Sequence, residues 1–146
     1  GDFPLLPAAT VLTPHPGEAA RLLHTSVREV QADRESAVRQ LADFYGCVAV
    51  LKGAGTLIAA PGQGDEIVRN PTGNPGLARG GSGDVLTGII TGLLTRGYRR
   101  PDACIVGMYL HGLAGDLAAR ELGVESLVAS DLITYLPQAF RQLQLS

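Results

Sequence analysis

A glycine-rich segment, followed by one carboxylate and then by an apolar helix pattern, offers the clearest chemistry in this chain. Three glycines surround a serine at residues 80–83, and Asp84 follows directly. Glycines allow positive φ angles and a close backbone approach to a ligand, and a helix start presents unpaired N–H groups with a partial positive charge. These features together predict an anion site, most naturally for phosphate.

Phosphoryl transfer requires backbone donors, a cation and a base beside the attacking oxygen. Residues 80–83 would supply the donors, Lys52 or a bound Mg²⁺ the cation, and Asp84 the base. The alternative for Asp84 is a first-turn acid that favours the helix dipole by about 0.3–1 kcal/mol, which leaves the preceding glycines unexplained. The segment is not a P-loop or a dinucleotide fingerprint, because it lacks the Gly-Lys-Ser/Thr ending and no strand runs directly into its glycines.

Lys52, the only lysine among 12 basic residues, follows a continuous apolar run at residues 47–51. That run predicts a central strand covered on both faces, and ligands of open α/β sheets bind at the carboxyl ends of strands. Lys52 is therefore a candidate for holding phosphate, with Gly53, Gly55 and Thr56 supplying close backbone approach and a hydroxyl. The alternative is a solvated strand end followed by a hairpin, but a second glycine-rich segment in the chain favours binding.

His15 lies between Pro14 and Pro16, just after an apolar segment at residues 9–12 that is typical of a buried strand. The two prolines stiffen this turn. His15 is either a turn residue bonded to backbone or a residue of the functional site, and the local sequence leaves both interpretations open.

The other predicted elements position these residues. Apolar periodicity and capping signals predict helices that begin at Pro16, cover residues 33–45, run from residue 82 or 83 to residue 96, extend from Pro101 to Gly123, and begin at Asp131. Short strands are predicted at residues 56–60 and 66–69.

Several predictions concern packing within these elements. Gly88 and Gly92 are expected to let another element approach the central helix closely, and the charges of the helix at residues 33–45, Arg34 included, are expected to face solvent. Ser130 is expected to cap the last helix, and Pro137 to kink or divide it. Helical positions without a ligand cluster are assigned structural roles; these are His111, Asp116 and Arg120.

Composition excludes several classes of protein. The 146 residues, 45% of them hydrophobic, suffice for one globular domain, and a net charge of −2 provides no basic face for nucleic acid. No apolar run reaches the roughly 18 residues needed to span a membrane, and the first residues lack the basic start of a signal peptide. Cys47 and Cys104 are interpreted as buried thiols in a reducing cytoplasm.

Three blocks of this sequence resemble the signature blocks of the NAD(P)H-hydrate dehydratase family, of the ribokinase-like superfamily. They are LTPHPGE at residues 12–18, LKGAGT at residues 51–56 and GNPGLARGGSGDVLTG at residues 73–88. Residues 110–137 are similar too. The resemblance implies a ribokinase-like three-layer α/β/α sandwich and a repair enzyme that uses ADP or ATP, with Mg²⁺, to dehydrate hydrated NADH or NADPH. The implied route is phosphorylation of the ring hydroxyl followed by loss of phosphate.

The resemblance also implies the roles of individual residues. Asp84 would be the catalytic base and face the hydrated nicotinamide, and His15 would contact the same substrate. The adenine nucleotide would be held by Lys52, Gly53, Ala54, Gly55, Thr56 and Gly83, and the anion hole would consist of Gly80, Gly81, Ser82 and Gly83.

The chain departs from the family in length, because family members have a domain of roughly twice this size. Residues 1–146 are therefore expected to form the carboxyl-terminal portion of a single ribokinase-like domain in a larger protein. The expected partners are the hydrated cofactor and an adenine nucleotide, with no nucleic acid and no membrane, and the resemblance implies a homo-oligomer, for example a tetramer. Two other functions stay open: a ribokinase-like kinase of a vitamin precursor or small alcohol, and a nucleotide-binding fragment without catalysis.

Overall fold

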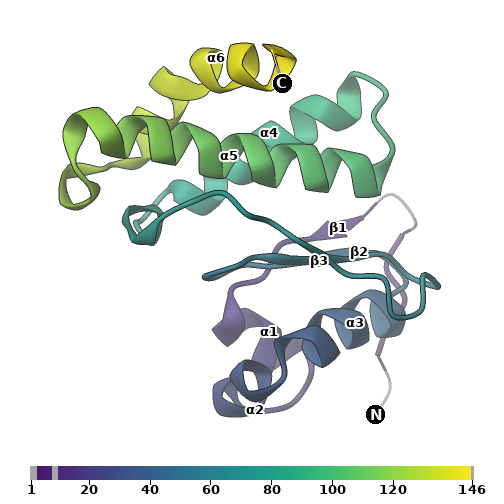
Figure 1. The fold of residues 1–146 in the computed structure, drawn as a ribbon. Helices are drawn as coiled ribbons and strands as arrows, with labels where there is room; N and C mark the ends of the chain where they lie inside the picture. The colour runs from purple at the N-terminus through teal and green to yellow at the C-terminus, as the bar shows by residue number, and fades with distance from the viewer. Residues whose placement is uncertain (1–2, 8–9, 146) are drawn as a thin grey trace. The chain divides into compact units, whose positions relative to one another are not determined.

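The computed structural model describes residues 3–7 and 10–145, which fold as two compact units (Figure 1). The first unit ends at Asn70 and the second begins at Pro71. Helices and strands share the first unit, whereas the regular structure described in the second unit is helical. The α/β class predicted from sequence is confirmed.

The first unit combines a four-stranded sheet with three helices in its described residues. Its elements in chain order are β1 (Val11–Leu12), α1 (Pro16–Leu22), α2 (Val27–Ala32), α3 (Arg34–Tyr45), β2 (Val48–Leu51), β3 (Leu57–Ala59) and β4 (Val68–Arg69). The strand order is β1-β2-β3-β4, with β1 parallel to β2 and the two following pairs antiparallel. Figure 1 shows α1, α2 and α3 on one face of this sheet.

The strand β2 is the predicted central strand. All four of its residues are buried, and it lies between β1 and β3. Its last residue, Leu51, pairs with Leu57 across the turn that contains Lys52. The strands predicted on either side are confirmed in shorter form as β1, β3 and β4, and Ala9, where the first was expected to begin, lies outside the described residues.

One face of α3 builds the core of the first unit. Its buried residues recur at helical spacing, as an amphipathic helix requires; they are Ala37, Val38, Leu41, Ala42 and Tyr45. They pack with Cys47 and with Ala49 and Leu51 of β2, and α3 ends as predicted at Gly46, where φ is +64°. Burial raises the pKa of the Cys47 thiol, and Cys104 is buried as well, so both cysteines are buried thiols as predicted.

Apolar periodicity misses α2, because Val30 is its one buried residue. Its start is nevertheless encoded locally. Ser26 Oγ accepts a hydrogen bond from the Glu29 backbone N–H at 3.1 Å, and the Glu29 carboxylate accepts one from the Ser26 N–H at 3.3 Å. The Ser-x-x-Glu spacing of this capping box was the available signal.

The second unit consists of η1 (Pro75–Leu77), α4 (Ser82–Thr95), α5 (Arg100–Leu122), η2 (Val124–Ser126) and α6 (Ala129–Leu145). The predicted bounds of α4 and α5 are confirmed. Gly97, at φ +92°, follows the end of α4, where its N–H bonds to Leu94 O and the Tyr98 N–H to Leu93 O, the pattern of a Schellman motif. Gly123 ends α5 at φ +82°.

The expected role of Gly88 and Gly92 in close packing is wrong for the described structure. Both are exposed, and a Cβ built at either position would meet no described atom within 4 Å. The close approach between α4 and α5 occurs at Gly107, where a Cβ would lie 2.8 Å from Ile90 Cγ1. A glycine permits close packing only if another element lies against its own face of the helix.

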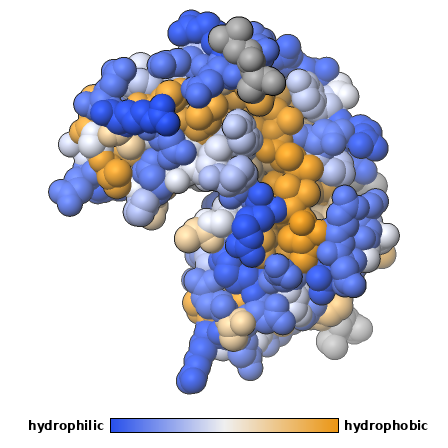
Figure 2. Space-filling view, in the orientation of Figure 1, coloured by the Kyte–Doolittle hydropathy of each residue, from blue (hydrophilic) through white to orange (hydrophobic). Residues whose placement is uncertain are grey.

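The helix α6 begins at Ala129, two residues before the predicted start. Asp131 serves this start instead of Ser130, because its Oδ2 accepts a hydrogen bond from the Val128 N–H at 2.9 Å. Pro137 was expected to kink or divide this helix; it lies inside one continuous helix, so the helix is not divided. In the view of Figure 2, hydrophilic residues cover much of the outer surface of α6.

The inner side of α6 packs on α5. The buried residues of this contact are Leu110, Leu113, Ala114, Leu117 and Ala139. None of the helices within residues 3–7 and 10–145 combines the length and the apolar character that crossing a bilayer would require.

Candidate active site

The end of β2 leads into a tight turn at residues 52–56. The Lys52 N–H bonds to Pro14 O at 2.9 Å, so the strand end is fixed beside the turn that contains His15. Thr56 Oγ1 donates to Gly53 O at 3.1 Å, which closes the turn. Gly53 and Gly55 have φ values of +135° and +65°, so both positions use the conformational freedom of glycine.

Two arginines lie against this turn. Arg34 Nη1 and Nη2 lie 3.4 Å from Lys52 O, and Nη2 lies 3.4 Å from Leu51 O. Arg69 Nη1 lies 3.5 Å from Gly55 O. Burial, followed by the charge of Arg69, lowers the pKa of Arg34. The prediction of a solvated Arg34 is therefore wrong: its guanidinium is partly buried and lies against the carbonyl oxygens of Leu51 and Lys52.

His15 forms the N-cap of α1. Its Nδ1 accepts hydrogen bonds from the N–H groups of Gly17 and Glu18, at 3.0 and 3.2 Å, and its Nε2 lies 3.1 Å from Glu18 Oε1. Because Nδ1 accepts, the proton of the neutral ring belongs on Nε2, facing Glu18. The backbone-bonded interpretation of His15 is thus the observed one, and 55% of its side chain stays exposed.

The glycine-rich segment forms an open turn at the start of α4. Gly81 is the N-cap at φ +86° and provides no side-chain hydrogen bond. The Ser82 N–H bonds to Arg79 O at 3.3 Å and the Val85 N–H to Gly81 O at 3.1 Å. Within the described residues, no hydrogen bond is recorded for the N–H groups of Gly83 and Asp84, so they are available to an anion. We call residues 80–84 the anion turn.

Asp84 is the acidic residue in the first turn of α4, and its side chain is exposed. No hydrogen bond or ion pair joins its carboxylate to another described residue. Ser82, two residues earlier, is buried, and its hydroxyl lies 3.1 Å from Nε2 of the buried His111. The anion turn therefore presents backbone N–H donors and an exposed carboxylate. The contact between Ser82 and His111 fixes the first helical turn on which they lie.

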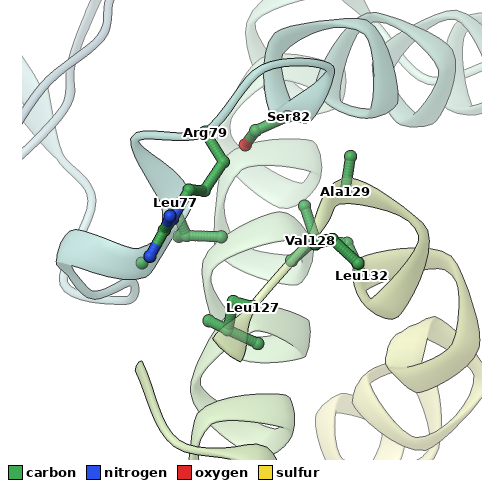
Figure 3. A pocket seen from close by; sticks show the side chains of 8 residues that line it. Leu77, Arg79, Ser82, Leu127, Val128, Ala129 and Leu132 are labelled. Atoms are coloured by element: carbon green, nitrogen blue, oxygen red, sulfur yellow. The ribbon is translucent and has the colours of Figure 1, made fainter. Parts of the chain in front are cut away.

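A shallow apolar pocket lies next to Ser82 (Figure 3). It has about 160 Å³ of empty space, open solvent included, and is lined by Gly76, Leu77, Arg79, Ser82, Leu127, Val128, Ala129 and Leu132. Figure 3 shows these side chains coming from η1, from the start of α4 and from the segment that enters α6. The sequence did not indicate this pocket, because its walls are separated by about 50 residues along the chain.

The predicted site residues fall into two groups. His15, Lys52, Gly53, Ala54, Gly55 and Thr56 belong to the first unit, where the hydrogen bond from Lys52 to Pro14 brings the two turns together. Gly80, Gly81, Ser82, Gly83 and Asp84 belong to the second unit. In the described part of the chain, no cluster of three or more His, Cys, Asp or Glu side chains is arranged to hold a metal ion.

Comparison with known proteins gives a consistent result. The model of the NAD(P)H-hydrate dehydratase family matches residues 2–138. The bifunctional NAD(P)H-hydrate repair enzyme of Moorella thermoacetica is 50% identical over 134 residues, which are 92% of this chain and 25% of that protein. The ADP-dependent (S)-NAD(P)H-hydrate dehydratase of Neisseria meningitidis is 49% identical over 123 residues, 84% of this chain and 41% of that protein.

Comparison with solved structures indicates the same family and fold. The ADP/ATP-dependent NAD(P)H-hydrate dehydratase of Bacillus subtilis, co-crystallised with ATP/Mg²⁺, matches with a TM-score of 0.87 and 38% identity, covering 94% of this chain and 50% of that one. A ribokinase-like superfamily protein of Enterococcus faecalis matches with a TM-score of 0.65 and 34% identity, covering 91% and 45%. The chain thus spans half or less of each of these proteins, and the predicted ribokinase-like fold is confirmed. The chain belongs to the NAD(P)H-hydrate dehydratase family.

Proposed function

We propose that the protein dehydrates hydrated NADH or NADPH back to the normal cofactor, with ADP or ATP as phosphoryl donor. The observation that carries the proposal is the anion turn, where free N–H groups directly adjoin the unpartnered carboxylate of Asp84 in a chain of this family. Backbone donors and a nearby base are what phosphoryl transfer to a hydroxyl requires.

In the proposed first step, Asp84 accepts the proton of the ring hydroxyl. The hydroxyl oxygen forms a bond to the terminal phosphorus of the nucleotide, and the bond from that phosphorus to the bridging oxygen breaks. When ADP is the donor, the nucleotide product is AMP. The backbone donors at Gly80, Gly81, Ser82 and Gly83 stabilise the negative charge on the phosphoryl oxygens.

In the second step the ring C–O bond breaks and phosphate leaves with the electron pair. A proton is lost from the neighbouring ring carbon, and the C=C bond of the reduced nicotinamide is restored. Phosphorylation is useful because phosphate is a far better leaving group than hydroxide. With ADP, the products balance as AMP, inorganic phosphate and the repaired cofactor.

The turn at residues 52–56, in the first unit, is proposed to bind an adenine nucleotide. Gly53 and Gly55 have positive φ values, and Lys52 adds a positive charge next to Gly53, Ala54, Gly55 and Thr56 at the end of the strand. His15 is proposed to contact the hydrated ring through the exposed part of its imidazole, since α1 and Glu18 already engage both of its nitrogens.

Mg²⁺ fits this site as a companion of the nucleotide. It prefers one or two carboxylates together with phosphate oxygens and water. The second unit offers the exposed Asp84 carboxylate next to the proposed phosphate position. When bound, the ion would neutralise charge on the phosphates; phosphate oxygens and water would hold it, and the nearby Asp84 carboxylate would stay available as the base.

The test is an assay of the full-length protein with hydrated NADH and ADP, ATP or no nucleotide. We expect recovery of the near-ultraviolet absorbance of reduced nicotinamide only with a nucleotide, with one inorganic phosphate released per cofactor repaired. A phosphorylated product that accumulates without phosphate release would instead indicate a kinase. Nucleotide binding without any turnover would indicate a non-catalytic protein.

The apolar surface around the pocket beside Ser82 is proposed to contact the adenine base of the nucleotide. Val128 lines the pocket and is 55% exposed, so Val128→Glu places a carboxylate at the pocket without disturbing the core. We expect the affinity for ADP to fall by about tenfold, because the apolar contact of Val128 is lost and a negative charge is added near the negatively charged phosphates. Isothermal titration with ADP would measure the change. The matched control is Ile133→Glu, five residues further along the chain within α6, 59% exposed and outside the pocket lining. Equal affinities in the two variants would place the base elsewhere.

A further inference from the structure

We propose that α5 is the template that sets the shape of the anion turn, and that Asp116 and His111 are positioning residues for the reaction. The proposal rests on the proposed function only in naming the bound anion as nucleotide phosphate. The two residues lie on one helix of 23 residues, and each holds one end of the loop at residues 73–82.

Asp116 holds the first end of the loop. Its Oδ2 accepts a hydrogen bond from the Gly73 N–H at 3.0 Å, and its Oδ1 accepts one from Asn74 Nδ2 at 2.8 Å. Asn74 Oδ1 in turn accepts from the Gly76 N–H at 3.0 Å, which caps η1. A carboxylate with two donors makes charge-assisted hydrogen bonds, which are stronger than neutral ones. Asp116 therefore fixes the chain direction at the entrance of the loop.

The loop lies directly on the backbone of α5 because two glycines leave room for it. A Cβ at Gly112 would lie 2.1 Å from Thr72 Oγ1, and a Cβ at Gly115 would lie 2.6 Å from Leu77 Cδ2. Thr72 Oγ1 also donates to Tyr109 O at 3.0 Å. The pattern His-Gly-x-Ala-Gly-Asp at residues 111–116 thus combines two contact points with two positions of close approach.

His111 holds the second end of the loop. Its Nε2 lies 3.0 Å from Ser82 O and 3.1 Å from Ser82 Oγ, and both residues are only 5% exposed. A carbonyl oxygen only accepts hydrogen bonds, so the contact with Ser82 O requires a proton on Nε2. This proton is directed at the first turn of α4, immediately before Gly83 and Asp84.

The consequence is pre-organisation of the donors. Free N–H groups bind an anion more tightly when their geometry exists before binding, because the ordering entropy need not be lost in the complex. Gly81 provides no side-chain cap of its own. The backbone conformation of the anion turn is therefore stabilised by contacts from α5 and by the 2.8 Å hydrogen bond from Arg79 Nη2 to Glu125 O.

The test is Asp116→Asn in the full-length protein. We expect ADP affinity to fall by about tenfold, the size associated with losing one charged hydrogen-bond partner. Amide hydrogen exchange of residues 72–84 should become faster. The matched control is Asp102→Asn, the same substitution in the same helix at a carboxylate that binds Arg99 and not the loop.

The double variant Asn74→Asp with Asp116→Asn provides the rescue. It exchanges the two side chains, so an amide again faces a carboxylate, and we expect it to recover most of the lost ADP affinity and the slow exchange. For His111, Gln keeps a donor for Ser82 O whereas Leu does not, so kcat should fall more in His111→Leu than in His111→Gln.

Two results would overturn the proposal. One is ADP affinity and exchange in Asp116→Asn equal to those of Asp102→Asn, and the other is a double variant no better than Asp116→Asn alone. Failure of the proposed function gives a different pattern: the parent protein would not repair hydrated NADH, while the ordering of ADP affinities among the variants would persist.

Discussion

An Asp84→Asn variant of the full-length protein is expected to lose roughly 10²- to 10⁴-fold in dehydration rate, the contribution typical of a general base. Asparagine keeps the size and the helix position of the side chain but cannot take the proton of the ring hydroxyl. Initial rates of cofactor recovery with saturating ADP would measure the loss. Because Asp84 is exposed and its carboxylate forms no hydrogen bond or ion pair with another described residue, the fold should remain intact.

The matched control is again Asp102→Asn, since Asp102 is the acid in the first turn of α5 as Asp84 is in α4. Both substitutions remove a favourable helix-dipole interaction of about 0.3–1 kcal/mol. Asp102→Asn also loses the ion pair with Arg99, so Asp84→Asn should destabilise the fold no more than the control does. Only Asp84→Asn should affect the rate. A rate in Asp84→Asn within about threefold of the parent would mean that another group accepts the proton.

Gly112→Ala is expected to destabilise the protein by about 3 kcal/mol or more, the upper range for an overpacked position. Alanine is intrinsically favoured over glycine within a helix by about 1 kcal/mol. The added Cβ, however, would lie 2.1 Å from Thr72 Oγ1 and 2.7 Å from the Thr72 carbonyl carbon. The backbone atom cannot rotate away, so residues near Thr72 must lift from α5. Urea unfolding of the full-length protein would measure the change.

Gly88→Ala is the control, and it is not expected to destabilise the protein. Gly88 also lies inside a helix, but a Cβ there would meet no described atom within 4 Å. Gly88→Ala should therefore leave stability unchanged or raise it by up to about 1 kcal/mol. Equal effects at the two positions would contradict the close packing of Thr72 on α5.

Local signals in the sequence were sufficient for most elements. Pro16 at the start of α1, Gly46 after α3, and Gly97 after α4 each act on the backbone within a few residues, so their effects are readable without the fold. The anion turn was predicted for the same reason, because glycine freedom and a helix start are both local properties.

Side-chain partners distant in the sequence were not predictable. Arg34 has the composition of a solvated helix face, yet it binds carbonyl oxygens 17 and 18 residues further on. Asp116 and His111 lie on a helix with no ligand cluster of their own, and their partners lie 29–43 residues earlier. Both residues were expected to have structural roles, and both form hydrogen bonds within the fold. The sequence did not indicate that they bond to the two ends of the loop at residues 73–82.

The sequence by itself determined most of the secondary structure, the glycine-rich turns and the family pattern, because these depend on backbone conformation and on residue order. Only the tertiary structure decided which glycines allow close packing. Gly88 and Gly92 are exposed, whereas Gly107, Gly112 and Gly115 lie under other segments. A glycine has no side chain to reveal its environment, so its role is set by the atoms that the fold brings against it.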